Sequence, residues 1–206
     1  MKKKIKVIYL GSSLNVDDST IDDGQILNKL PEKYILFVGN RATYKNFTFF
    51  ITSISSLLKS DKDLNLVCAG GSNFSLEEKE LFSQLKISKK LFYFSINDKF
   101  LTVLYKNAVA FVFPSLCEGF GIPILESFSC GCPNILANTT SLPEIAKDAA
   151  IYFKPKDSNS ILEAVSKVIY DNDLRQDLIY KGCERLKDFS WEKAVLETLR
   201  VYESVL

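Results

Sequence analysis

The chain of 206 residues contains no histidine. Histidine is the commonest general base in enzymes, and it activates the nucleophile in Ser-His and Cys-His systems. Its absence excludes those nucleophile systems from this chain. The imidazole of histidine is also the commonest metal ligand, so the sequence offers few groups for a metal site.

Cysteine is scarce, and its five occurrences do not pair by spacing. Cys130-Gly-Cys132 has neither the redox nor the zinc spacing. Most of the cysteines lie in apolar surroundings and are interpreted as small core residues. We therefore expect no structural metal, no disulfide framework and a reducing, cytoplasmic compartment.

Long apolar runs and an excess of one charge are also missing. The 26 basic and 25 acidic residues leave a net charge of +1, so the sequence lacks the excess of basic residues that is typical of nucleic-acid-binding proteins. No run is long enough to span a membrane. Met1 and three lysines before residues 5–10 mimic a signal peptide, but Lys6 interrupts the short apolar part. A β-strand over residues 5–10 is the better interpretation.

Short apolar runs alternate with stretches of helical periodicity. The predicted strands are residues 34–38, 64–69, 91–94, 109–113, 134–137 and 150–153, and the predicted helices are 45–59, 75–85, 98–107, 123–130 and 141–146. This alternation predicts an α/β fold, a Rossmann-like doubly wound parallel sheet with helices on both faces. The extra C-terminal helices have no strands between them, so we expect them to wrap the sheet.

Helix starts and apolar stripes give further local predictions. Ser75 with Glu78, and Ser141 with Glu144, match the capping-box pattern. Two helical stripes follow, one at residues 161, 164, 165, 168 and 169 and one at residues 191, 194, 195, 199 and 202.

The most informative stretch runs from residue 114 to residue 126. A predicted buried strand feeds a turn containing Gly119 and Gly121, and Pro123 suits the first turn of the helix that follows. Free N–H groups at such a helix start favour an anion, typically phosphate. Glu118 and Glu126 bracket the turn, and carboxylates accept hydrogen bonds from hydroxyls. Phosphate-binding and hydroxyl-binding groups together suggest a sugar nucleotide.

This turn resembles the E-x7-E motif of retaining glycosyltransferases of the GT-B fold, glycosyltransferase family 4 (group 1) in particular. The segments 37–46, 108–126, 129–133, 141–144 and 189–191 follow that family in order. The resemblance covers about residues 31–206 and concerns the C-terminal, donor-binding half of such enzymes. It implies that residues 1–30 are a remnant of the interdomain crossover or linker, and that an N-terminal acceptor half or partner subunit is missing.

The resemblance also implies roles for the two glutamates and the loops. Glu118 would contact the donor sugar's hydroxyls near the reacting carbon, and Glu126 the ribose hydroxyls. The backbone N–H groups that would face the sugar or phosphate belong to Gly119, Phe120, Gly121 and Ile122. Ser95 and Ile96 lie in the loop that binds the base in relatives, although relatives often carry glycine near Ser95.

Arg41 and Lys45 follow a predicted strand and the turn at Gly39 and Asn40. Ligands of open α/β sheets bind beyond the carboxyl ends of the strands, so two cations there can clamp a diphosphate. Their charge would stabilise the leaving nucleoside diphosphate as the glycosidic bond breaks. No metal is then required, and no Asp-x-Asp pair is placed to hold one.

The sequence therefore predicts the donor domain of a hexosyltransferase acting in cell-surface polysaccharide or glycoconjugate synthesis. Its donor would be a UDP-, GDP- or ADP-sugar with a mannose- or glucose-like hexose. Without the acceptor half the chain alone would be inactive, and any membrane contact would come from that half. Three alternatives stay open: one half of a GT-B sugar-nucleotide epimerase, a non-catalytic sugar-nucleotide-binding subunit and, with little support, a flavodoxin-like regulator.

Overall fold

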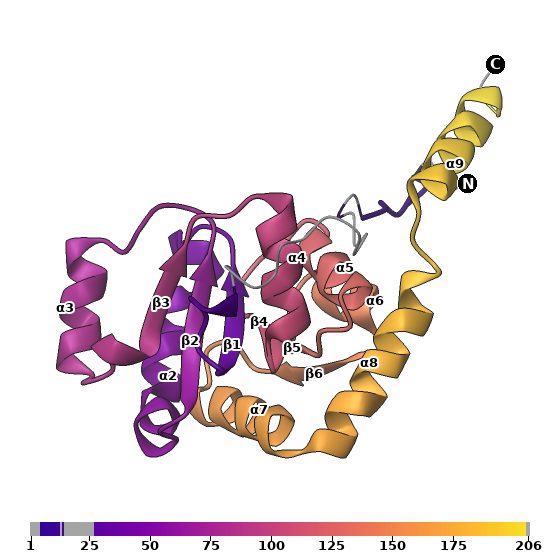
Figure 1. Cartoon of the computed structure of the whole chain (residues 1–206). Coiled ribbons are helices and arrows are strands. Elements are labelled where there is room, and N and C mark those ends of the chain that lie inside the picture. Colours follow the sequence, from indigo (N-terminus) through magenta and orange to yellow (C-terminus); the bar gives the residue numbers. More distant parts are fainter. Residues whose placement is uncertain (1–4, 13, 15–26, 205–206) are drawn as a thin grey trace.

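The computed structural model describes residues 5–12, 14 and 27–204 of the chain, and its centre is one parallel sheet (Figure 1). The six strands pair in the order β3-β2-β1-β4-β5-β6. They are β1 (Lys33–Val38), β2 (Leu64–Ala69), β3 (Leu91–Phe94), β4 (Ala110–Phe113), β5 (Asn134–Ala137) and β6 (Ala150–Phe153). Every neighbouring pair is parallel. The predicted doubly wound α/β class is confirmed.

The strands form because they can bury side chains on both faces. All four residues of β4 and of β5 are buried, as are five of the six residues of β1. Such strands read as nearly continuous apolar runs rather than alternating ones. Four predicted strands have the observed bounds, and the other two differ by one residue at their first position.

Helices connect the strands and cover both faces. They are α2 (Phe47–Ser60), α3 (Leu76–Gln84), α4 (Asp98–Asn107), α5 (Ile122–Ser129), α6 (Leu142–Ala146), α7 (Ser158–Tyr170), α8 (Asn172–Leu186) and α9 (Trp191–Glu203), with short 3₁₀ turns η2 (Thr43–Lys45) and η3 (Ser88–Lys90). Helix α2 packs beside α7, and α4 packs beside α5. The helical connections lie on both sides of the sheet, and the strand order reverses between β1 and β4 (Figure 1).

One predicted capping box is confirmed, and the other is wrong. The Ser75 hydroxyl accepts from the Glu78 N–H at 3.2 Å, and the Glu78 carboxylate accepts from the Ser75 N–H at 2.8 Å. Ser141 has a helical backbone (φ −79°, ψ −19°), and its side chain forms no cap bond. An N-cap needs extended backbone to bring its oxygen over the first turn, so Ser141 and Glu144 are available to other partners.

The C-terminal helices depart in part from the prediction that they wrap the sheet. The predicted stripe on α7 is buried. On α8, Gly182 lies so close to α5 that a Cβ would sit 2.6 Å from Phe128 Cδ1. Helix α9 instead extends away from the sheet (Figure 1). Within its predicted stripe Ala194 is buried, whereas Trp191, Val195, Leu199 and Tyr202 are exposed.

The strand predicted over residues 5–10 is wrong, because residues 5–12 have no regular secondary structure. This segment runs beside the start of α9 (Figure 1). A Cβ on Gly11 would lie 2.5 Å from the Trp191 nitrogen, and Lys6 pairs with Glu197 at 3.9 Å. A strand requires a backbone ladder, and here the neighbour is a helix. Residues 1–4, 13 and 15–26 of the predicted linker lie outside the described residues.

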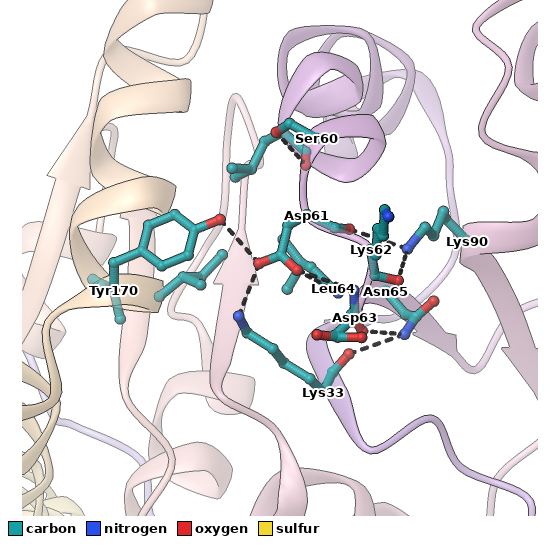
Figure 2. A network of polar contacts seen from close by, with 12 residues as sticks. Lys33, Ser60, Asp61, Lys62, Asp63, Leu64, Asn65, Lys90 and Tyr170 are labelled. Atoms are coloured by element: carbon teal, nitrogen blue, oxygen red, sulfur yellow. Dashed lines mark hydrogen bonds and ion pairs between the residues drawn. The ribbon is translucent and has the colours of Figure 1, made fainter.

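A polar network ties the amino edge of the sheet together (Figure 2). The Asp61 carboxylate accepts from Lys33 Nζ at 2.8 Å and from the Tyr170 hydroxyl at 2.9 Å. It also accepts the backbone N–H groups of Asp63 and Leu64 at 3.0 and 3.1 Å. One side chain thus joins the starts of β1 and β2 to the end of α7.

No helix among the described residues is both long and apolar enough to cross a membrane.

Candidate functional site

Two loops meet where the strand order of the sheet reverses. Strands β1 and β4 are hydrogen-bonded neighbours, and their connections run to opposite sides. The loop after β1 (39–46) and the loop after β4 (114–121) therefore leave the same carboxyl edge. The Leu116 N–H donates to the Tyr44 carbonyl at 2.7 Å and joins them. In open α/β sheets this switch point is where ligands bind.

An ion pair joins the two loops at this edge. Lys45 Nζ lies 2.7 Å from Glu118 Oε1, and the side chains are only 12% and 15% exposed. The turn η2 carries Lys45, whose Nζ also lies 4.9 Å from the centre of the Phe113 ring. The structure brings together two of the predicted site residues from positions 73 apart in the chain.

Arg41 takes a different partner. Its Nε lies 2.6 Å from Glu78 Oε1, and its Nη2 donates to the carbonyls of Ser72 and Asn73 at 2.6 and 3.0 Å. The guanidinium also packs near aromatic rings, at 5.0 Å from the centre of the Phe74 ring. Its side chain is 5% exposed. The structure thus places Arg41 against the start of α3, where a carboxylate already balances its charge.

Three glycines let the loops after β1 and β2 approach each other closely. Gly39 and Gly71 have φ of +118° and +68°, which favour glycine. A Cβ on Gly71 would lie 2.9 Å from Asn40 Cα, and one on Gly70 would lie 3.4 Å from Ile96 Cδ1. The predicted loop positions therefore converge on the carboxyl ends of β1, β2 and β3. Ser95 is exposed there.

The loop after β4 (114–121), which carries Glu118 and is called the glutamate loop, leads into α5 as predicted, with proline in the first turn of the helix. Gly121 is the N-cap at φ +102°, and no side chain caps the helix. A Cβ on Gly119 would meet open space, so this part of the loop is accessible. Phe120 is half-buried, and Ile122 is exposed. The uncapped start leaves helix N–H groups available to an anion.

Glu126 lies on α5 and is half-buried. Its carboxylate accepts from the Tyr105 hydroxyl at 3.1 Å. Burial raises the pKa of Glu126, nearby Asp98 raises it further, and the Tyr105 hydrogen bond opposes them. Burial also keeps the pKa of Tyr105 well above its usual value, so this phenol remains a neutral donor.

The sequence did not reveal the residues that hold the glutamates. The Glu118 N–H donates to Thr140 Oγ1, and the Ser141 hydroxyl donates to the Glu118 carbonyl, both at 3.1 Å. Tyr105 reaches Glu126 from α4. These contacts link positions 21 to 23 residues apart through the packing of separate elements, so no local pattern marks them.

The site combines a lysine–glutamate pair, glycine turns and an uncapped helix start on one edge. Such groups can hold a polyanion that also carries hydroxyls. In the part of the chain that the structure describes, no three His, Cys, Asp or Glu side chains are grouped as metal ligands. A hollow of about 390 Å³ lies beside the loop after β1, and it is lined by Arg41, Ala42, Thr43, Asn46, Phe47, Thr48, Phe49 and Thr52.

Comparison with known proteins gives a family match over most of the chain. The family model described as "Glycosyl transferases group 1" matches residues 18–185. O-antigen chain mannosyltransferase B of Escherichia coli is 39% identical over 108 residues, which are 52% of this chain and 28% of that protein. O-antigen chain mannosyltransferase RfbU of Salmonella typhimurium is 30% identical over 81% of this chain and 44% of its own length. The chain therefore spans about half or less of these curated relatives.

Solved structures show the same fold at low identity. Sucrose-phosphate synthase from Thermosynechococcus elongatus superposes with a TM-score of 0.82 at 23% identity, over 97% of this chain and 52% of that one. The C-terminal domain of a glycosyl transferase group 1 family protein from Francisella tularensis superposes with a TM-score of 0.68 at 23% identity. That alignment covers 88% of this chain and 95% of the domain.

Proposed function

The chain belongs to the group 1 glycosyl transferases, and from that premise we propose that it is the donor-binding half of a retaining hexosyltransferase. The donor is a nucleotide-diphospho-sugar with a mannose- or glucose-like hexose. The names of the O-antigen mannosyltransferase relatives support a role in cell-surface polysaccharide synthesis. A cytoplasmic location is part of the proposal. The observation that carries the proposal is the Lys45–Glu118 pair at the switch point of the sheet.

In this proposal each polar group has a chemically matched partner on the donor. Lys45 and the N–H groups at the start of α5 hold the diphosphate. Glu118 accepts hydrogen bonds from the donor sugar's hydroxyls near the reacting carbon. Glu126 accepts from the ribose, and its burial suits it to a neutral hydroxyl partner rather than an ion.

The same groups supply the electrostatics of the reaction. Negative charge grows on the departing nucleoside diphosphate as the glycosidic bond breaks, and a lysine and a helix start stabilise it without a metal. In the structure Lys45 Nζ lies 2.7 Å from Glu118 Oε1. Binding would let Lys45 turn to phosphate while Glu118 turns to the sugar, so the two charges exchange partners rather than lose them.

Arg41 enters the proposal as a second cation whose contact with diphosphate requires it to leave Glu78. Two variants separate this from a bracing role. If Arg41 binds phosphate, Arg41→Ala weakens diphosphate binding, and Glu78→Gln, which releases Arg41, strengthens it or leaves it unchanged. If Arg41 only braces the loops, both variants weaken nucleotide binding alike.

The acceptor half belongs to a further domain or a partner subunit in this proposal. The exposed side chains of α9 support this, since Trp191, Leu196, Leu199 and Tyr202 are each 44–61% exposed. An apolar row of this kind is a typical docking face. The chain's coverage of about half or less of its relatives agrees with it. The acceptor must be held within about 3–3.5 Å of the anomeric carbon, so this chain alone would not transfer sugar.

Calorimetry with the purified chain tests the donor site. UDP, GDP and ADP are compared with their nucleosides in Lys45→Ala and in Lys167→Ala, a charge-matched control on the exposed face of α7. We expect Lys45→Ala to lower diphosphate affinity by on the order of 1.5–3 kcal/mol while nucleoside binding changes little. Equal losses of affinity for diphosphate and nucleoside would contradict the proposed site, as would a parent chain that binds none of these nucleotides.

A transfer assay with both halves present tests the chemistry. Glu118→Gln is expected to bind nucleotide normally and to lose sugar transfer. Normal turnover of that variant contradicts the role of Glu118. Binding without transfer by the complete parent enzyme indicates a non-catalytic subunit, and epimerisation of UDP-sugar indicates an epimerase instead.

A further inference from the structure

The backbone of Glu118 is held by the segment between β5 and α6. Thr140 and Ser141 each form a 3.1 Å hydrogen bond with it, and the Thr139 hydroxyl donates to the Ser115 carbonyl at 3.0 Å. Thr140 has φ +45°, which is unfavourable for a β-branched residue. Surrounding structure must enforce such a conformation. The position of Glu118 therefore depends on what holds α6.

Helix α6 is held by a buried arginine of α8. Arg185 is 8% exposed, and its Nε and Nη2 donate to the carbonyls of Ile145 and Glu144 at 2.8 and 3.0 Å. Carbonyls near the end of a five-residue helix lack partners within the helix. The guanidinium also pairs with Asp188 and lies 4.5 Å from the centre of the Phe189 ring. Arg185 thus fixes α6 against α8.

A tyrosine near the start of the chain reaches both α6 and the glutamate loop. The Tyr9 hydroxyl donates to Glu144 Oε1 at 2.7 Å. Its ring centre lies 6.2 Å from that of Phe120 and 5.5 Å from that of Phe189, and the rings of Phe120 and Phe189 are 6.0 Å apart. Phe120 is two residues beyond Glu118. The far side of the loop is open at Gly119, so its order comes from these flanking contacts.

We propose that Tyr9 is a positioning residue that holds the Glu118 loop in its ligand-ready conformation, with Arg185 as its support. The hydroxyl of Tyr9 fixes α6 through Glu144, and its ring packs against Phe120. Thr140 and Ser141, which precede α6, are hydrogen-bonded to the backbone of Glu118, so the position of α6 determines that of Glu118. A loop ordered in advance loses less conformational entropy when it binds a ligand. The inference rests on the proposed donor-binding role of Glu118.

A spin label on Cys117, next to Glu118, tests the order of the loop directly. Cys117 and Cys183 are the exposed thiols among the five cysteines, so a Cys183→Ser background leaves one reactive site. We expect Tyr9→Phe to add a mobile component to the nitroxide spectrum and Tyr9→Ala to enlarge it. Tyr170→Phe is the matched control, because it also removes a hydroxyl bound to a carboxylate, at the other edge of the sheet.

A conservative pair at Glu144 excludes a general loss of structure. Glu144→Gln keeps an oxygen that accepts from Tyr9 and should retain the parent spectrum, whereas Glu144→Ala should be mobile. Circular dichroism of each variant verifies that it is folded. Tyr9 variants that are folded and have the parent spectrum would overturn the proposal.

Binding of UDP, GDP and ADP to the unlabelled variants completes the test. We expect Tyr9→Phe to weaken binding several-fold, because the loop must now be ordered on binding. If the label loosens while affinity stays at the parent value, the positioning role is wrong. A loosened label in a chain that binds none of the three nucleotides supports the brace and contradicts the proposed function. If the Tyr9 variants have the spectrum of the parent and the chain binds nucleotide, the brace is contradicted and the proposed function is supported.

Discussion

The two edges of the sheet each hold a lysine–carboxylate pair, and the pairs are nearly the same in length. Lys33 and Asp61 lie 2.8 Å apart at the amino edge, and Lys45 and Glu118 lie 2.7 Å apart at the carboxyl edge. All four side chains are at least two-thirds buried. Distance and burial therefore do not separate a pair that holds the fold from one that can bind a ligand.

The remaining hydrogen bonds do separate them. Asp61 accepts from four groups of the chain, including two backbone N–H groups and Tyr170 (Figure 2). Among the described residues, the donor bound to the Glu118 carboxylate is Lys45. A carboxylate with its acceptor sites filled has nothing left for a ligand, whereas one held by a single flexible lysine can change partner. The amino edge is thus structural, and the carboxyl edge can be rearranged.

Asp61→Ala should have the largest effect, and on stability alone. It leaves Lys33 without its carboxylate and frees two backbone N–H groups, so we expect a loss of about 2–4 kcal/mol in the free energy of unfolding. Urea denaturation measures it, with Asp63→Ala as the control because Asp63 contributes its backbone to the network. Nucleotide binding should not change. A stable Asp61→Ala variant would show that the amino-edge network holds nothing together.

Lys45→Ala should show the opposite separation. The loss of binding proposed above, on the order of 1.5–3 kcal/mol for diphosphate, should come with less than about 1 kcal/mol of lost stability. The Glu118 carboxylate that loses its partner lies in a loop that is open at Gly119, so it can turn to water. Urea denaturation beside calorimetry on one preparation gives both values. A stability loss as large as that of Asp61→Ala would make this pair structural too and would end the contrast between the edges.

Much of the fold could be predicted from the sequence, because its elements have local causes. The strands are short apolar runs, and Ser75 with Glu78 marks the start of α3 by a pattern three residues long. The failures involve absent or distant partners. The segment 5–12 has an apolar pattern but lies against α9, and the α9 stripe faces no other described element over most of its length.

The site was predictable in type but not in pairing. The types of residue at Lys45, Glu118 and Glu126 are those that a sugar nucleotide would require, and that assignment stays a prediction. That Arg41 would turn to Glu78 could not be read from the sequence, since it depends on how the glycine turns bring the loops after β1 and β2 together. The contacts of Thr140 and Ser141 with Glu118 could not be predicted either, because they depend on how separate elements pack. In the sequence, Ser141 with Glu144 matches a capping box instead.

Glu126→Gln should separate binding from stability in a third way. Burial raises the pKa of Glu126, so between the unfolded and the folded pKa the folded state holds more protons, and stability falls as the pH rises. Glutamine removes that ionisation and still accepts from Tyr105. We expect unchanged or higher stability at pH 7 and nucleotide binding weaker by about 1 kcal/mol. Thermal unfolding at pH 4 and pH 7 measures the first, and a variant less stable than the parent at pH 7 contradicts it.

Tyr170→Phe should have a small effect on stability, about 0.5–1.5 kcal/mol for one lost hydrogen bond. Its dependence on pH distinguishes the bond from simple packing. Lys33 first, and then Tyr170 and two backbone N–H groups, hold the pKa of Asp61 at about 2, against burial that raises it. This lowered pKa contributes stability above the unfolded value of about 3.9, and the contribution disappears as the pH falls through about 2. Without the Tyr170 hydroxyl the pKa of Asp61 rises, so acid unfolding of the variant should begin at a higher pH. The difference in stability from the parent should be full at pH 6 and shrink on approaching pH 2. A difference that stays constant down to pH 2 would mean that the hydroxyl acts independently of the Asp61 charge, since phenylalanine keeps the ring that lies 5.1 Å from Lys33 Nζ.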